Sequence, residues 1–485
     1  MTHLLTVLPW GRTLSVPAGA NLLRLLRSAG LAPEAPCGGR GTCGKCTVLI
    51  DGTEVKACAV TVDRDLTVTV PQKQNLRILT DGIAIHAADA ADGFRLAFDV
   101  GTTTVAGVLL DPRGNTLAVD SAPNPQAAYG ADVVSRIRAA LEGHMEALTA
   151  AIRNCLNNMA LSLCTRGHLL PTDITQVTLV GNPAMQQLFL GILPENLSHP
   201  PFPPLLTNPE TVDASAHLPC LKNADLLIVP DISGFVGADT LGCILATGMD
   251  TSEEITLLVD IGTNGELVLG NRHRLVSCAT AAGPALEGAC IQFGMTARPG
   301  AIDHVHIENG TMICHTIAGV DATGICGSGL IDAVACGLKL GLLNSRGKIL
   351  AESGRIPLTD TVFLTQEDIR QVQLAKGAIA AGIRLLAEQM AISLDQIHRV
   401  YLAGAFGTYL DPESACRIGL LPPELANNIA AVGNAALSGA MRLALDPQAP
   451  ECCRKTVAKT EAINLAQHPA FPRTFAICMR FDTEG

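Results

Sequence analysis

The chain has 485 residues, of which 48% are hydrophobic, and its formal net charge is -11 at pH 7. A chain of this length exceeds what one hydrophobic core usually organises, so we expect two or three globular domains. The negative charge argues against nucleic acid or an anionic membrane as a partner, because phosphate groups would be repelled by the protein's own field.

The N-terminus lacks a basic segment followed by an apolar run. No stretch approaches the roughly 18 uninterrupted apolar residues of a membrane helix. We therefore expect a cytoplasmic protein without a membrane partner. Most of the 17 cysteines stand as single residues in apolar surroundings, as in residues 241–244, and we interpret these as reduced core cysteines.

The first part of the chain, residues 3–70, alternates short β-rich runs with one helical segment, residues 20–29. Runs of apolar and β-branched residues bounded by turn residues are typical of strands. This order predicts a small β-grasp domain over residues 1–72. The expected strands are residues 4–8, 13–16, 46–50 and 66–70.

Four cysteines of this domain, Cys37, Cys43, Cys46 and Cys58, follow the pattern C-x5-C-x2-C-x11-C, with a glycine-rich loop around the first three. Such a loop can turn sulfurs inward and point backbone N–H groups at a negatively charged cluster. The pattern resembles that of plant-type and adrenodoxin-type [2Fe-2S] ferredoxins. We expect a [2Fe-2S] cluster here and electron transfer as the activity; a zinc site or free thiols stay open as alternatives.

Residues 73–93 contain an Ala/Asp-rich stretch without a clean hydrophobic period, which predicts a linker. About twenty extended residues span roughly 60–70 Å. The first domain could therefore change position while keeping a high effective concentration near the rest of the chain.

From Phe94 onward, apolar strands end at glycines and helices follow, which is typical of an α/β domain. Residues 96–104 recur about 160 residues later as residues 257–266, each time as an apolar strand that ends in Asp-x-Gly-Thr. An internal repeat of this kind indicates two similar lobes. We place their boundary near residue 255, within a unit of residues 94–485.

Asp99 and Asp260 each end a strand at a glycine hairpin, where a carboxylate and turn amides could bind magnesium and phosphate. We expect these two residues to be catalytic. Two further glycine turns, residues 324–330 and 400–407, suit the same face. The residues expected to bind the nucleotide are Gly101, Thr102, Thr103, Gly262, Thr263, Asn264, Gly327, Ser328, Gly329, Gly404, Ala405, Phe406 and Gly407.

Together these motifs resemble the phosphate-1, phosphate-2 and adenosine motifs of the acetate and sugar kinase, Hsp70 and actin superfamily (ASKHA). The expected fold is therefore α/β and α+β multidomain: a β-grasp ferredoxin domain followed by a two-lobed actin-like ATPase domain. Asp132 and Arg136 lie one helical turn apart, which favours a solvated intrahelical ion pair over a role in the cleft.

The segments at residues 124–133, 180–185, 232–240 and 281–289 resemble those of ATP-dependent reductive activators of corrinoid proteins. The resemblance covers nearly the whole chain and implies one-electron reduction of a methyltransferase's cob(II)amide to cob(I)amide. It implies a [2Fe-2S] cluster, ATP and Mg²⁺ as cofactors. The implied partners are a corrinoid protein, an upstream reductase or ferredoxin and, for a homodimer, a second copy of the chain. Asp99 follows the linker almost directly, which leaves no room for an additional middle domain.

Two other functions stay open. One is a small-molecule kinase of the same superfamily with a fused ferredoxin domain, although no residue stands out as the base beside an acceptor hydroxyl. The other is a non-enzymatic binding module switched by ATP, which would leave the cluster cysteines without a role.

Overall fold

The computed structural model describes residues 2–9, 11–29, 31, 33, 41, 46–70, 82–85, 92–262 and 264–481. Cys37, Cys43 and Thr263, which we expected at the functional site, lie outside these residues, as does the side chain of Ala405. Among the helices of the described residues, none has the length and apolar character needed to cross a membrane.

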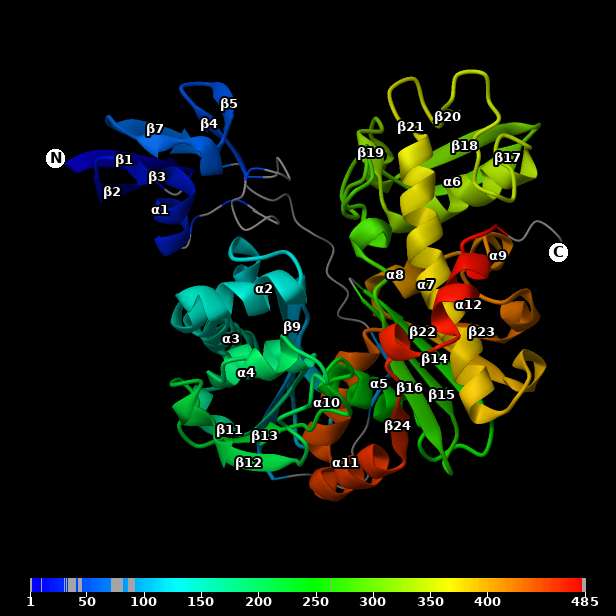
Figure 1. Ribbon diagram of the computed structural model, residues 1–485. Helices are drawn as coiled ribbons and strands as arrows, with labels where there is room; N and C mark the ends of the chain where they lie inside the picture. Colours follow the sequence, from blue (N-terminus) through cyan, green and yellow to red (C-terminus); the bar gives the residue numbers. More distant parts are fainter. Residues whose placement is uncertain are drawn as a thin grey trace.

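The N-terminal domain is a five-stranded mixed sheet in the order β2-β1-β7-β4-β5, covered by one helix (Figure 1). The helix α1 (Leu22–Ser28) begins at Asn21, whose side chain accepts from the Arg24 backbone N–H. It buries Leu22, Leu23 and Leu26 against the sheet. The expected β-grasp arrangement is confirmed. Its strands are β1 (Thr2–Leu8), β2 (Arg12–Pro17), β4 (Thr47–Ile50), β5 (Thr53–Lys56) and β7 (Leu66–Thr69), with a small pair β3 (Ala20–Asn21) and β6 (Thr61–Val62).

The first lobe of the second unit contains a six-stranded sheet in the order β10-β9-β8-β11-β13-β12. Three strands form an antiparallel meander, and β11 then runs parallel to β8. The strands are β8 (Phe94–Val100), β9 (Thr104–Leu110), β10 (Thr116–Pro123), β11 (Ile174–Gly181), β12 (Glu210–Asp213) and β13 (Asp225–Ile228). One face of the sheet is covered by α2 (Val133–Ala139), α3 (Met145–Arg166) and α4 (Pro183–Leu190).

The second lobe repeats this plan with a sheet in the order β23-β22-β14-β15-β16-β24. Again three strands form an antiparallel meander, and β22 runs parallel to β14. The internal repeat of the sequence therefore corresponds to two similar sheets. The strands are β14 (Thr256–Ile261), β15 (Gly265–Gly270), β16 (Leu275–Thr280), β22 (Arg399–Ala403), β23 (Ile429–Gly433) and β24 (Thr460–Ala462).

Two helices, α5 (Ala238–Thr247) and α10 (Ala435–Leu445), lie between the two sheets (Figure 1). Their apolar side chains form one buried cluster with Ala97 and Val108 of the first sheet and Leu258 and Val268 of the second. Gly242 and Gly439 allow the two helix backbones to touch, since a Cβ on Gly439 would overlap the backbone of Gly242. This layer fixes the ends of β8 and β14 near each other.

The outer part of the second lobe is a three-stranded sheet packed on a helix. Its strands are β17 (Ala301–Glu308), β18 (Thr311–Thr316) and β19 (Gly324–Ile325), and the helix is α6 (Gly327–Lys339). The remaining elements are β20 (Ile356–Pro357), β21 (Phe363–Leu364), α7 (Gln366–Met390), α8 (Gly404–Tyr409), α9 (Pro412–Arg417), α11 (Ala449–Ala458) and α12 (Phe471–Cys478).

Residues 82–85, in the middle of the expected linker, lie against the second unit. A Cβ on Gly82 would overlap the Ser438 hydroxyl and come within 2.7 Å of the Asn434 carbonyl oxygen. Ile85 packs against the apolar layer between the two sheets. The linker is therefore attached near its middle, which shortens the reach expected of a free chain of its length.

Candidate functional site

The two repeated hairpins bring their aspartates to one place between the lobes. Asp99 is near the end of β8 and Asp260 near the end of β14. Glu266 lies directly opposite Asp260 in the β14–β15 register, and Asp239 lies in the first turn of α5. All four carboxyl groups are partly exposed, so they line an opening rather than a closed core.

These carboxyl groups are close enough to perturb one another. Burial, reinforced by the charge of Asp260, raises the pKa of Asp99 to about 7. Burial and the charges of Asp260 and Asp99 raise the pKa of Asp239 to about 7. Burial raises the pKa of Asp260 to about 6 and that of Glu266 well above its usual range. Without a cation, the cluster therefore holds protons at neutral pH.

Two neutral groups hold the paired aspartates in place. Asn434, which caps α10, donates from Nδ2 to an Asp99 carboxylate oxygen at 2.9 Å. The Cys243 thiol of α5 lies 3.6 Å from Asp260 Oδ2 as a donor. Burial raises the pKa of Cys243 well above its ordinary value, so it stays a thiol. The sequence analysis treated Cys243 as a reduced core cysteine, and it has this additional contact.

The first hairpin, residues 101–103, is held from behind by asparagines. Asn124 donates from Nδ2 to the Gly101 carbonyl at 2.8 Å and from its backbone N–H to the Thr103 carbonyl at 2.9 Å. Asn182 donates to the Thr102 hydroxyl at 3.1 Å. Both asparagines cap a helix that begins with proline. The Asn-Pro dipeptides were the signal in the sequence that could have identified them.

The turn at residues 404–407 meets the second hairpin. Gly404 has φ +81°, and a Cβ there would lie 2.7 Å from Asp260 Oδ1, so only glycine fits this close approach. Phe406 contacts the next motif, since a Cβ on Gly327 would lie 2.7 Å from its ring. Gly407 packs on Leu402 of β22. The second hairpin and both glycine turns are thereby joined in one lobe.

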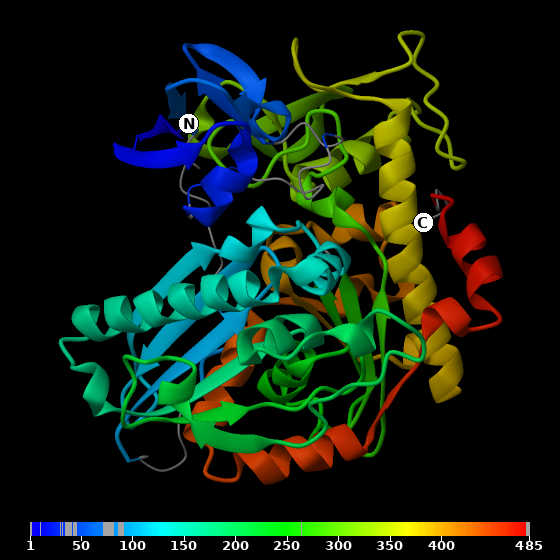
Figure 2. The ribbon, with the colours of Figure 1, turned by 60° about the vertical axis from the view of Figure 1, so that its left-hand side comes forward.

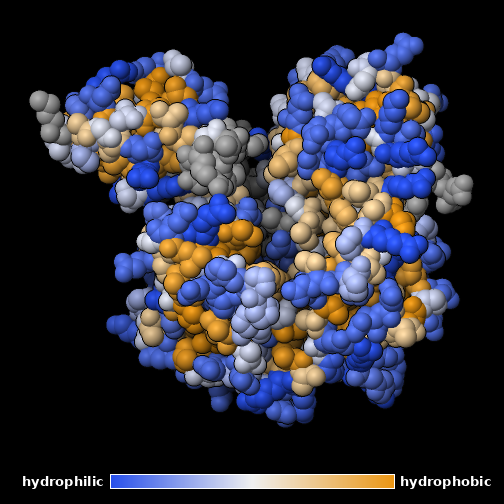
Figure 3. All heavy atoms as spheres, in the orientation of Figure 1, coloured by the Kyte–Doolittle hydropathy of each residue, from blue (hydrophilic) through white to orange (hydrophobic). Residues whose placement is uncertain are grey.

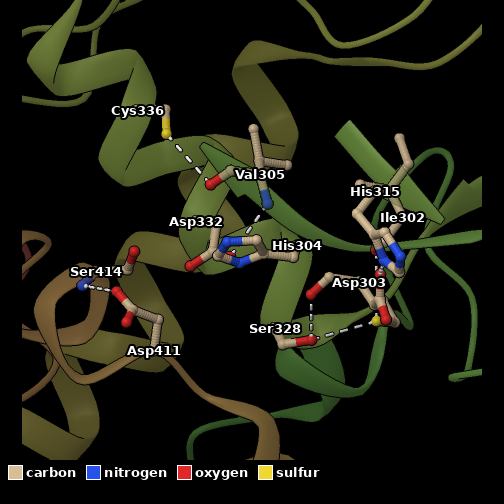
Figure 4. Close-up of polar contacts among 11 residues, drawn as sticks. Ile302, Asp303, His304, Val305, His315, Ser328, Asp332, Cys336, Asp411 and Ser414 are labelled. Atoms are coloured by element: carbon tan, nitrogen blue, oxygen red, sulfur yellow. Dashed lines mark hydrogen bonds and ion pairs between the residues drawn. The ribbon is translucent and has the colours of Figure 1, made fainter. Parts of the chain in front are cut away.

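At the start of α6, Ser328 and Gly329 face β17 (Figure 4). The Ser328 hydroxyl donates to the Asp303 backbone carbonyl at 2.8 Å. A Cβ on Gly329 would overlap the Ile302 carbonyl. Figure 4 also shows the nearby ion pair of His304 with Asp332, whose Nδ1–Oδ2 distance is 2.5 Å. The side-chain contacts of Ser328 are thus internal, and its contact with a nucleotide stays a prediction.

In the first domain, Cys46 and Cys58 are described. Cys46 is buried immediately before β4, and Cys58 lies in a short 3-10 helix, Ala57–Ala59. The Ala57 N–H donates to the Cys46 carbonyl at 2.7 Å, which brings the two segments together. Asn21 donates to the Cys58 carbonyl at 2.9 Å. Neither cysteine is in a disulfide. Two thiols supported in this way fit the sulfur donor set of an iron-sulfur cluster.

The cleft contains four functional candidates that the sequence analysis did not single out: Asp239, Glu266, Cys243 and Asn434. Asp239 follows the glycine-rich stretch at residues 233–237, and a helix that starts with Asp after glycines was a usable signal. Glu266 belongs to the repeat itself. Asn434 had no signal, because it lies 335 residues from Asp99 in the sequence.

The expected ion pair of Asp132 with Arg136 is wrong. Arg136 is fully buried, and its guanidinium donates to the Gly130 carbonyl at 2.9 Å and to the Thr102 carbonyl. Asp132 instead caps α2 by accepting from the Ser135 N–H at 2.7 Å. Arg136 therefore supports the first hairpin from inside the lobe.

Across the described part of the chain, no three His, Cys, Asp or Glu side chains are arranged to hold a metal ion directly. The four carboxyl groups of the cleft are thus a charged lining rather than a closed coordination sphere.

Three family models match the chain in consecutive segments. Residues 5–75 match the 2Fe-2S iron-sulfur cluster binding domain. Residues 94–252 match the RACo middle region, and residues 254–485 match the C-terminal domain of RACo, the ASKHA domain. The segment that the sequence analysis assigned to the first lobe therefore corresponds to the middle region of that family, which the chain does have. The division at residues 252–254 lies beside the expected lobe boundary near residue 255.

The similar proteins cover most of the chain. The corrinoid activation enzyme RamQ of Eubacterium limosum is 34% identical over 418 residues, which are 80% of this chain and 70% of that protein. The [Co(II) methylated amine-specific corrinoid protein] reductase of Methanosarcina barkeri is 32% identical over 248 residues, 47% of this chain and 45% of that protein. A solved structure of a reductive activator for corrinoid, iron-sulfur protein is 27% identical, with a TM-score of 0.71 over 99% of this chain and 98% of that one.

Proposed function

Because the chain belongs to the family of reductive activators of corrinoid proteins, we propose that it uses ATP to return an inactive cob(II)amide cofactor of a methyltransferase's corrinoid protein to cob(I)amide. The observation that supports this most is the meeting of Asp99, Asp239 and Asp260 between two lobes of a chain that also has the ferredoxin cysteine pattern.

The cysteines Cys37, Cys43, Cys46 and Cys58 would hold the [2Fe-2S] cluster, with Asn21 supporting the backbone at Cys58. When bound, such a cluster supplies a one-electron carrier near roughly -400 mV. An upstream reductase or ferredoxin would deliver electrons to this domain.

In the ATPase unit, the turn amides of the two hairpins would face the phosphates. The carboxylates Asp99, Asp239, Asp260 and Glu266 would hold a hydrated Mg²⁺. An all-oxygen donor set suits this cation, which usually keeps several of its waters. Water-mediated binding also agrees with the lack of a direct three-ligand group among the described residues.

ATP has to make an uphill electron transfer favourable, because the cob(I)amide state requires a strong reductant. A gap of about 0.1 V costs about 2.3 kcal/mol per electron. A ligand that binds one protein state about 10⁴-fold more tightly supplies roughly 5.5 kcal/mol. Closure of the two lobes on the nucleotide could therefore cover the gap without phosphorylating a substrate.

The test is an anaerobic mixture of the cluster-loaded protein, a chemical reductant and a corrinoid protein in the cob(II)amide state, followed by the absorbance of cob(I)amide. We expect the absorbance to grow with ATP and to stay near its baseline without it. Phosphorylation of a small metabolite, with no effect of ATP on the cobalt, would instead support the kinase.

The raised pKa values in the cleft predict a pH dependence of nucleotide binding. Below their pKa values of about 6 to 7, Asp99, Asp239 and Asp260 are largely neutral and attract Mg²⁺ poorly. The affinity for Mg·ATP should therefore rise by about tenfold from pH 6 to pH 8, as one proton is released per nucleotide bound. Calorimetry at both pH values measures this change, and Asp239→Asn should give a flatter profile. An equally steep profile in the variant would assign the effect to the nucleotide's own titration.

Ser328 supplies a contrasting prediction. Its hydroxyl is bonded to the Asp303 carbonyl inside the lobe, so Ser328→Ala should lower the free energy of unfolding by about 1 kcal/mol. The affinity for ATP should stay within about twofold of wild type, because no side-chain contact with the nucleotide is lost. A large loss of affinity at unchanged stability would show that the hydroxyl turns toward the phosphates.

A further inference from the structure

The ferredoxin domain contacts the first lobe through its only helix. The guanidinium carbon of Arg27, in the last turn of α1, lies 5.7 Å from the ring centroid of Tyr129. The Nε and Nη2 atoms of Arg27 are inaccessible to solvent. Figures 1 and 2 both show α1 beside α2 and the loop that precedes it. A cation over an aromatic face is attracted more strongly when water is excluded.

The loop that carries Tyr129 is tied to the first hairpin. Gly130, the next residue, accepts from Arg136 Nε, and the same guanidinium donates to the Thr102 carbonyl. Arg136 has no exposed surface, and burial lowers its pKa to about 10. A buried cation bonded to two carbonyls cannot release one of them without leaving donors unpaired. Thr102 and the Tyr129 loop should therefore move together.

The linker provides a second contact with the same cleft. Gly82 lies against the carbonyl of Asn434, the residue whose amide binds the Asp99 carboxylate. The space there accepts no Cβ, so this contact depends on glycine. A shift of Asp99 on nucleotide binding acts on Asn434, and through it on the point where the linker is attached.

We propose that these two contacts link nucleotide binding to the position of the ferredoxin domain. Arg136 connects the first hairpin to the Tyr129–Arg27 contact, and Asn434 connects Asp99 to the linker at Gly82. Arg27, Tyr129 and Gly82 are thus positioning residues for the electron-transfer domain. The surface is hollowed between this domain and the outer part of the second lobe (Figure 3), which leaves space for the domain to move.

This inference rests on the proposed use of ATP, yet it can be tested without cobalt. Linkage is reciprocal: if the nucleotide stabilises the attached position of the domain, then the attached position raises the affinity for the nucleotide. Breaking a contact on the ferredoxin domain should therefore weaken nucleotide binding in a cleft that the altered residue does not touch.

The experiment measures the affinity of the cluster-loaded full-length protein for a non-hydrolysable ATP analogue with Mg²⁺. We expect Arg27→Gln and Gly82→Ala each to weaken binding about fivefold. The matched control is Arg24→Gln, which removes the same charge from an exposed position of α1 and should bind the analogue like wild type. The visible spectrum of the cluster should be unchanged in all three variants.

A conservative pair of variants distinguishes positioning from a loss of structure. Tyr129→Phe keeps the aromatic face and should bind the analogue like wild type, whereas Tyr129→Leu should match Arg27→Gln. Wild-type affinity in Arg27→Gln and Gly82→Ala would overturn the inference. If ATP fails to stimulate cobalt reduction while these variants still lose affinity, the proposed function fails and the linkage stands.

Discussion

Replacing Asp260 by asparagine is expected to lower the ATP-stimulated rate of cobalt reduction by about 100-fold or more. Asp260 lies at the point where the second hairpin, Gly404 and the charges of Asp99 and Asp239 meet. The substitution removes a negative charge that would orient hydrated Mg²⁺, while the shape of the side chain is nearly unchanged. The slow rate without ATP and the visible spectrum should stay as in wild type, because the cysteines belong to another domain.

The control for this variant is Asp225→Asn, which removes a carboxylate of the same kind from the exposed start of β13. Stopped-flow absorbance of cob(I)amide, with and without ATP, measures both variants. Full stimulation in Asp260→Asn would remove the cleft from the mechanism. A lost cluster spectrum would instead show that the substitution acts through folding.

Replacing Cys46 by alanine is expected to give a colourless protein without measurable electron transfer. Cys46 is buried beside Cys58, and its backbone carbonyl holds the Ala57 N–H. The alanine keeps this backbone contact but removes one of four thiolates, and serine is avoided because its oxygen could still bind iron. ATP affinity should fall by no more than the roughly fivefold expected from a loosened ferredoxin domain.

Cys155→Ala serves as the matched control, because this half-buried cysteine of α3 lies outside the cluster loop. It should keep the full visible spectrum and full activity after anaerobic reconstitution. Iron and sulfide analysis of both variants completes the measurement. Wild-type iron content in Cys46→Ala would rule Cys46 out as a ligand.

Much of the fold could be predicted because its signals are local. The expected strand at residues 13–16 is β2 (Arg12–Pro17), and the expected helix at residues 20–29 is α1 (Leu22–Ser28), shortened by the cap at Asn21. The repeat of Asp-x-Gly-Thr gave two lobes, since a hairpin at the end of an apolar strand is defined by neighbouring residues. The comparisons with known proteins confirm the ferredoxin domain, the ATPase domain and the corrinoid-activating family.

The rest of the site could not be predicted because its contacts join distant segments. Asn434 reaches Asp99 only when α10 packs between the sheets, and Cys243 reaches Asp260 only from α5. Arg136 was assigned to solvent because a sequence shows its neighbour Asp132 but not the carbonyls of Thr102 and Gly130. The attachment of the linker at Gly82 likewise depends on a surface formed by α10.

The most direct test of the central claim is a single-turnover experiment without excess reductant. The full-length protein is reduced at its cluster, freed of reductant, and mixed anaerobically with an equal amount of corrinoid protein in the cob(II)amide state. On addition of ATP, we expect cob(I)amide to appear while the oxidised cluster spectrum returns in equal amount; without ATP, neither change should occur. Equal formation of cob(I)amide with and without ATP, or reoxidation of the cluster without cob(I)amide, would contradict the proposed coupling.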